Sequence, residues 1–196
     1  ITQAGQKMSL QYGKITAPQF IKASTTIKKN LSGLSDNSVK EFTHLAALTS
    51  QATDSSIDAM SLLLTKGYQL FNQDFTSDAQ FGQQFSAAIS ATSKQFNISG
   101  ADLSQGLNQI GSAAKNMGIS TTEGLSVIGV AAKEFGSANA AGKKYQAFLE
   151  GAKHSTNKLE GVNFTNSADK MLPMIAIIDQ LKQKFGDTID ESEKLQ

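Results

Sequence analysis

The chain has 196 residues, of which 39% are hydrophobic and 18% are charged, and its formal net charge at pH 7 is +1. Disordered chains usually combine low hydropathy with high net charge, so this composition predicts a folded protein long enough to bury a sizeable core. Cysteine is absent, which excludes disulfides, thiolate nucleophiles and cysteine-ligated metals.

All basic residues are lysines, and they are scattered along the chain rather than gathered in a stripe. Specific recognition of phosphate or guanine usually uses the planar fork of arginine, and holding a DNA backbone or an anionic membrane needs a basic stripe. We therefore expect no specific nucleic-acid partner. The longest apolar run, at residues 171–178, is far shorter than the ~18 residues that span a bilayer, so we expect no membrane span in this segment.

In chain order, residues 1–35 predict an N-terminal helical segment that continues from upstream chain. Residues 36–196 predict a helical domain, and the first segment can form one unit with it because no linker rich in Pro, Gly or charge separates them. Since the first residue is Ile rather than Met, we expect the chain to be a piece of a longer one.

Beyond residue 35, apolar residues recur at steps of three and four, which is the spacing of one helix face. One stripe begins at Val39, a second runs from Ile57 to Phe71, and a third runs from Phe81 to Phe96. Aromatic residues at this spacing form a core far more often than a cofactor site. These segments therefore predict packed helices.

Residues 137–153 predict a further helix, and residues 154–170 a polar connector. The segment after the connector has the pattern of an amphipathic helix that ends at Gly186. The residues expected to face inward are Leu172, Ile175, Ile178 and Leu181.

The ends of the predicted helices follow one formula. A serine can cap the first free amides while an acidic or amide residue three positions later reaches back, and this pattern occurs at Ser55 with Asp58, Ser77 with Gln80, Ser99 with Asp102 and Ser120 with Glu123. At the other end, a lysine in the last turn precedes a Gly or Asn that can adopt the left-handed conformation, as at Lys94, Lys115 and Lys133.

An internal repeat is visible in the segments GLNQIGSAAKNMG and GLSVIGVAAKEFG, at residues 106–118 and 124–136, in which eight of thirteen positions are identical. Each copy has an apolar stripe, Leu107, Ile110, Ala113 and Met117 in the first and Leu125, Ile128, Ala131 and Phe135 in the second. Beside it lies a stripe of small residues, Gly111, Ala114 and Gly118 in the first copy and Gly129, Ala132 and Gly136 in the second.

Glycine inside a helix costs roughly 1 kcal/mol relative to alanine, so its recurrence favours a close approach of two backbones. The repeat therefore predicts two antiparallel helices packed small face to small face. For the whole chain we predict an all-α fold, a multi-helix bundle of short capped antiparallel helices with an internal helical repeat.

Side chains suited to catalysis are few. Of the two histidines, His44 lies on a predicted helix beside Phe42 and Leu45 and His154 in a polar loop, so a structural or surface role is favoured for each. The segment GSANAAGKK at residues 136–144 has the wrong spacing for a phosphate-binding loop and no strand before it. We expect no catalytic residues, no metal and no cofactor.

Three segments occur in a characteristic order: SSIDAMSLLLTKGYQLF, then the block from AISATSKQF to AFLEG, and finally LEGVNFTNSADKMLPMIAIIDQLKQKFGD. The last of these contains a connector with Leu159, Gly161 and Val162, followed by a helix with Ile178, Asp179 and Leu181. In this order the chain, from about Val39 onward, resembles the conserved helical domain of phage tail tape-measure proteins. It departs from that pattern at residues 143–158, where the family often has a helix rich in leucine and arginine.

The resemblance implies a structural virion protein of a phage or prophage tail that acts in tail assembly and tail-length determination and is later ejected with the genome. The implied partners are the tail-tube protein, tail assembly chaperones, baseplate proteins and other copies of the chain. The implied locations are the lumen of the tail tube and, during assembly, the bacterial cytoplasm. The alternative hypothesis is a helical protein-binding module unrelated to phage, such as a secreted bacterial effector or an adaptor.

Overall fold

The computed structural model describes residues 15–152, 159 and 161–186. Within these ranges the chain forms eight α-helices and one short 3-10 helix, and its only β-structure is a single bridge between Thr165 and Met171. The predicted all-α multi-helix bundle is thereby confirmed. The elements are α2 (Ala17–Asn30), α3 (Asp36–Ala52), α4 (Ile57–Phe71), η1 (Asn72–Asp74), α5 (Asp78–Phe96), α6 (Gly100–Met117), α7 (Thr121–Phe135), α8 (Ala138–Ala152) and α9 (Met174–Phe185).

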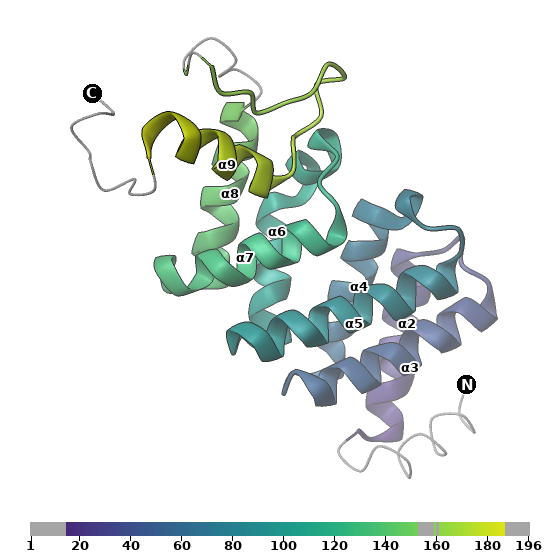
Figure 1. Ribbon diagram of the computed structural model, residues 1–196. Helices are drawn as coiled ribbons and strands as arrows, with labels where there is room; N and C mark the ends of the chain where they lie inside the picture. The colour runs from purple at the N-terminus through teal and green to yellow at the C-terminus, as the bar shows by residue number, and fades with distance from the viewer. Residues whose placement is uncertain (1–14, 153–158, 160, 187–196) are drawn as a thin grey trace.

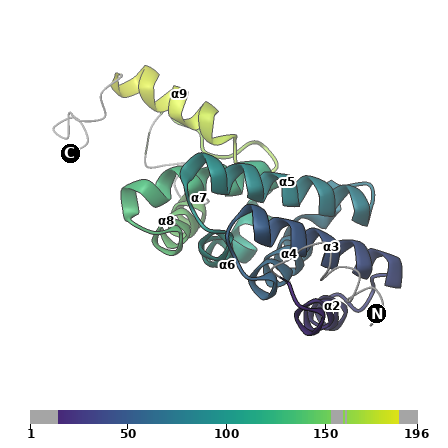
Figure 2. The same ribbon diagram turned by 90° about the horizontal axis from the view of Figure 1, so that it is seen from below.

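Helices α2 to α8 are arranged in two layers. Figures 1 and 2 show α2, α4, α6 and α8 side by side in one layer and α3, α5 and α7 in the other, with the two layers crossing at a steep angle. Each helix therefore contacts the next helix of the chain, across the layers, and the next but one, within its own layer. This pattern of contacts is the one found where helix pairs stack into an extended array.

One hydrophobic core runs through the array. Its aromatic centre is Phe81, whose ring stacks on Phe85 at a centroid distance of 5.0 Å and meets Tyr68 and Phe75 edge to face at 5.3 and 5.2 Å. The described part of the first predicted segment contributes to the same core, since α2 buries Phe20 there. Helix α2 thus packs with α3 and α4 as part of one array.

Serine side chains cap most of these helices. Ser99 and Ser120 are the N-caps of α6 and α7, where each Oγ accepts a hydrogen bond from the backbone N–H three residues later, at 3.1 and 3.2 Å. Ser77 caps α5 in the same way. A full capping box, in which the third residue also reaches back to the cap, forms between Thr16 and Gln19 of α2.

The cap predicted for α4 is wrong by one residue. Ser56, not Ser55, is the N-cap, and its Oγ accepts from the N–H of Ala59 at 3.1 Å. The Oγ of Ser55 instead accepts from the N–H of Ala101 at 3.2 Å, which is a free amide in the first turn of α6. Ser55 therefore caps a helix that is distant in sequence, and the sequence pattern could not reveal this because it reports only local spacing.

The segment after α8 closes one end of the array. Its residues 161–172 form a loop that turns back on itself at residues 166–170, and the loop bonds to the end of α6, with the N–H of Met171 donating to the carbonyl oxygen of Met117 at 2.8 Å. Because these bonds hold residues 171 and 172 outside the helix, α9 begins at Met174. Of the residues expected to face inward, Leu172 and Leu181 are half-buried and pack against the core, but Ile175 was predicted wrongly, since it is 66% exposed while Ile177 is 1% exposed.

Candidate interaction surfaces and the internal repeat

The two copies of the repeat are α6 and α7, which lie in different layers and contact each other. The first two positions of each apolar stripe lie in the core. They are Leu107 and Ile110 in α6 and Leu125 and Ile128 in α7, and all four are fully buried. The copies differ at their last apolar position. Met117 is buried where the loop of residues 161–172 bonds to the end of α6, whereas Phe135, at the end of α7, is 49% exposed.

The small-residue stripes do not face each other, so this part of the prediction is wrong. Gly111 interrupts α6 with φ +29° and ψ −119°, and a Cβ there would have no atom within 4 Å. Gly129 lies in regular helix, but a Cβ there would overlap the ring of Phe96 on α5. Gly111 therefore allows a kink in α6, and Gly129 leaves space for the ring of Phe96 against α7.

The remaining stripe residues separate into core and helix ends. Ala114 and Ala132 are buried. Gly118 and Gly136 are the C-caps of α6 and α7, and both adopt the left-handed conformation, with φ +69° and +76°. This conformation is what the stop formula predicts, since glycine adopts it at no steric cost.

Close approach of two backbones occurs between α6 and α8 instead. A Cβ on Gly142 would overlap the carbonyl oxygen of Gly106, and one on Gly106 would lie 2.7 Å from the carbonyl oxygen of Ala138. Gly106 opens the first copy of the repeat, but Gly142 lies outside both copies. The residues of the contact were therefore missed, although a glycine in the middle of a helix was a usable signal for both.

A polar link joins α7 to α9. Glu123 does not reach back to its own N-cap as predicted, because its Oε1 accepts from the N–H of Met174 at 2.7 Å. That N–H is free because the N-cap of α9 is Pro173, which makes no side-chain cap. Nearby, the hydroxyl of Tyr145 is buried and makes no hydrogen bond within the described ranges. Burial, and secondarily the charge of Glu123, raises the pKa of Tyr145 above its ordinary value.

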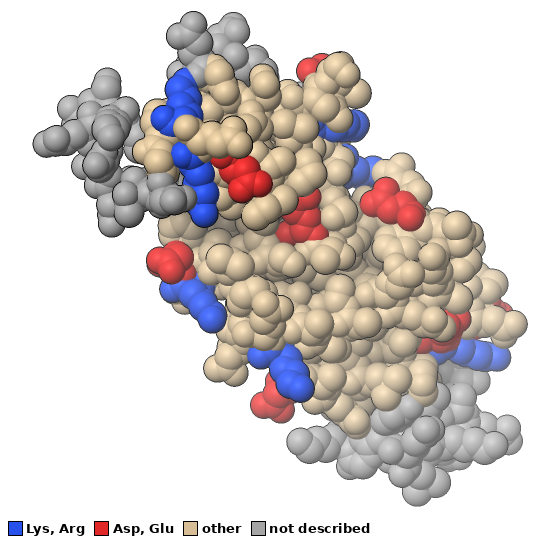
Figure 3. Space-filling model, viewed as in Figure 1, with Lys and Arg blue, Asp and Glu red and all other residues tan. Residues whose placement is uncertain are grey.

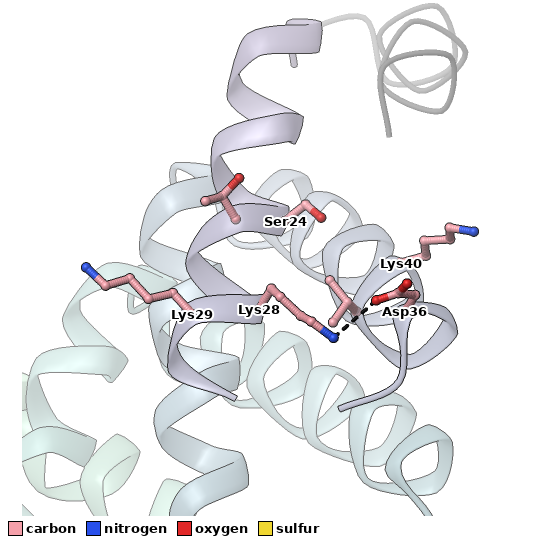
Figure 4. A pocket seen from close by; sticks show the side chains of 7 residues that line it. Ser24, Lys28, Lys29, Asp36 and Lys40 are labelled. Carbon is pink, nitrogen blue, oxygen red and sulfur yellow. Dashed lines mark hydrogen bonds and ion pairs between the residues drawn. The ribbon is translucent and has the colours of Figure 1, made fainter. Parts of the chain in front are cut away.

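A groove of about 640 Å³ lies between α2 and α3. Ser24 and Val39 are buried at its base, and three lysines and one aspartate line its sides. Lys28 makes an ion pair with Asp36 at 3.1 Å and donates to the carbonyl oxygen of Leu34 at 2.9 Å. Figure 4 shows Lys29 and Lys40 on opposite sides of this pair, extending away from it.

An uncharged surface is found over α5, in the middle of the layer formed by α3, α5 and α7. Between Asp78 and Lys94 this helix has no charged residue, and its exposed positions are Gln83, Gln84, Ala87 and Ala91. In Figure 3 the centre of this face is accordingly uncharged. The molecule thus presents amide and methyl groups at the centre of this face.

Neither the histidines nor the carboxylates form a metal-binding cluster in the described ranges, where no three such residues come together. His44 lies half-buried on α3, and His154 is outside the described residues. The GSANAAGKK segment is the end of α7 followed by the start of α8, where the Oγ of Ser137 accepts from the N–H of Ala140 at 3.1 Å. None of the helices that can be described is long and apolar enough to cross a bilayer.

These features define an all-helical protein whose described residues form packing contacts, helix caps and candidate interaction surfaces. A family model described as phage-related minor tail protein matches residues 2–196, and the chain belongs to that family. Comparison with curated proteins and with solved structures gave no match. Family membership makes the chain a component of a phage tail with a structural role, which decides against the alternative of a binding module unrelated to phage.

Proposed function

We propose that this chain is a folded segment of a tape-measure protein, which acts in tail assembly and tail-length determination and leaves with the genome. The observation that carries the proposal is the family match over nearly the whole chain, together with the ordered segments that resemble the tape-measure domain. A role for this segment as a measuring rod is not part of the proposal.

The helix lengths argue for an assembly role rather than a rod. A rod that sets length should be one continuous helix, in which every residue adds about 1.5 Å. Here the longest described helix, α5, has 19 residues, and the chain crosses between layers after each helix from α2 to α7. Such an array gains little length per residue, so it fits a docking unit within a longer protein.

The proposed partners are the tail-tube protein, the assembly chaperones, baseplate proteins and other copies of the chain. The proposed locations are the cytoplasm during assembly and the tube lumen in the virion. We also propose that the segment has no catalytic role. In support, no three His, Asp or Glu side chains come together among the described residues, and buried hydroxyls such as those of Thr43 and Ser61 donate to carbonyl oxygens of their own helices.

The experiment is quantitative mass spectrometry of purified virions before and after genome ejection. We expect peptides of this chain in intact virions at a constant ratio to the tail-tube protein, and their loss from emptied tails. The tube protein is the internal control because it stays in the tail. Retention of the chain in emptied tails at an unchanged ratio would contradict ejection, and its absence from intact virions would contradict the proposal as a whole.

A further inference from the structure

The groove between α2 and α3 is lined by more lysines than aspartates, so it has an excess of positive charge. Among the described residues that line it, the lysines are Lys28, Lys29 and Lys40, and the one acidic residue, Asp36, is paired with Lys28. Lys29 and Lys40 are exposed, and neither makes an ion pair or hydrogen bond with the residues whose positions are described. Two ammonium groups on the sides of the groove are thus available to an acidic partner.

The chain itself contains an acidic segment of suitable size. Residues 187–196, DTIDESEKLQ, have four carboxylate side chains against one lysine, which is a net side-chain charge of −3. The segment also contains Ile189 and Leu195, whose side chains can contact Val39 and the aliphatic stems of the lysines. Charge and apolar content both match the lining of the groove.

The acidic segment begins far from the groove of its own molecule. Figure 1 places α9, which precedes this segment, at the opposite end of the array from α2 and α3. Three steps between neighbouring helices, from α2 through α4 and α6 to α8, cover roughly 24–30 Å at the usual spacing of packed helices. Ten residues reach at most ~36 Å when fully extended, so a segment that crossed this distance would have almost no length left to occupy the groove.

We infer that the groove between α2 and α3 binds residues 187–196 of a second copy of this chain, with Lys29 and Lys40 facing the carboxylates. The contact is head to tail, because the acidic segment of one copy meets the groove of the next. A contact of this kind builds a ring or an open chain of copies, and reciprocal exchange of the segment between two copies gives a closed dimer. The inference does not depend on the proposed tape-measure function, since it concerns only the surfaces of this chain.

Two variants separate the halves of the contact. Lys29→Glu with Lys40→Glu reverses the charge of the groove but keeps the acidic segment, whereas deletion of residues 187–196 removes the segment but keeps the groove. Both lysines are exposed and unpaired among the described residues, so the fold should tolerate their replacement. The matched control is Lys143→Glu with Lys144→Glu, an exposed lysine doublet on α8 that is outside the groove.

Sedimentation velocity at increasing concentration measures the association. We expect the parent chain and the α8 control to associate, and each of the two test variants to be monomeric at 20.8 kDa or slightly below. An equimolar mixture of the test variants should form a complex of about twice that mass and no larger, because it contains one intact groove and one intact segment. Association should weaken at least ~10-fold in 0.5 M salt, since exposed charges are screened there.

The contrary results are equally definite. A parent chain that stays monomeric at millimolar concentration would overturn the inference. Association of the truncated chain as strong as that of the parent would also overturn it, because the groove would then not bind residues 187–196. Equal weakening by the α8 control would make the effect one of net charge alone. Association of the parent without complex formation in the mixture would assign self-association to another surface.

Discussion

At the scale of single residues, glycines at equivalent positions of the repeat have different physical roles. Gly111 is needed for its backbone conformation, because φ +29° is strained for any residue with a Cβ. Gly129 is needed for space, because the ring of Phe96 lies where a Cβ would be. The two roles predict different responses to substitution.

Gly111→Ala should destabilise the protein by about 1–3 kcal/mol through backbone strain, although the added methyl group meets no atom. The measurement is the free energy of unfolding from urea denaturation. Gly151→Ala is the control, because Gly151 is an exposed helical glycine with the same open surroundings but without a positive φ. It should raise stability by up to ~1 kcal/mol. Equal or higher stability for Gly111→Ala would mean that α6 is straight.

Gly129→Val should cost about 1–3 kcal/mol by overpacking the contact between α7 and α5. If the overlap with Phe96 is the cause, Phe96→Ala should be less harmful in the Gly129→Val background than in the parent, and a double-mutant cycle in urea measures this coupling. Additive effects of the two substitutions would show that the ring does not sit over Gly129.

Tyr145→Phe should leave stability unchanged or raise it by about 1 kcal/mol at pH 7, because the hydroxyl is buried without a hydrogen-bond partner among the described residues. The pKa of Tyr145 is raised in the folded state, so its protonated form contributes stability that is complete below the ordinary tyrosine pKa of about 10 and declines above it. Parent protein should therefore lose more stability than Tyr145→Phe between pH 7.5 and 10.5. Parallel losses in urea titrations at these two pH values would contradict the burial of this hydroxyl.

At the scale of the elements, helix ends are stabilised partly by residues from other helices. Ser55 accepts a hydrogen bond from the first turn of α6, and Glu123 of α7 accepts one from the first N–H of α9. Both residues had been predicted to cap locally. In each of these contacts, a side chain outside a helix accepts a hydrogen bond from an amide in the first turn of that helix. Each cap therefore also holds two parts of the array together.

Ser55→Ala and Ser56→Ala should each cost about 1 kcal/mol, but they should expose different amides to solvent exchange. Ser56→Ala should speed hydrogen exchange at the N–H of Ala59 in α4, and Ser55→Ala at the N–H of Ala101 in α6. Two-dimensional NMR exchange on the folded protein reads both amides in one experiment. Faster exchange at Ala59 in the Ser55→Ala variant would instead support Ser55 as the N-cap of α4.

Local signals in the sequence were sufficient for most of the secondary structure. Periodicity identified the helices, and the caps at Ser99 and Ser120 and the left-handed ends at Gly118 and Gly136 follow from short-range chemistry. The partners of each helix could not be predicted in this way. Whether a glycine contacts a ring, a backbone or nothing depends on residues distant in sequence, as Gly129 shows with Phe96.

At the scale of the whole molecule, the layered array determines how the chain uses its length. Helices α4, α5 and α6 each contact two helices before and two after in the chain, so the removal of one helix disrupts the packing of its neighbours. The groove between α2 and α3 lies at one end of this array and helix α9 lies at the other. Such an array can connect partners at its two ends, whereas its contribution to length is small for its number of residues.

The central claim, that this segment is a folded assembly unit rather than part of a measuring rod, is tested most directly by tail length in electron micrographs of the parent phage. The test is an in-frame deletion of residues 119–136, which removes α7. We predict that the deletion abolishes or severely reduces tail formation, because α5, α6 and α8 all lose packing contacts with α7. Viable particles whose tails are uniformly shorter by ~27 Å, the length of 18 residues of continuous helix, would contradict the claim and make the segment part of the rod.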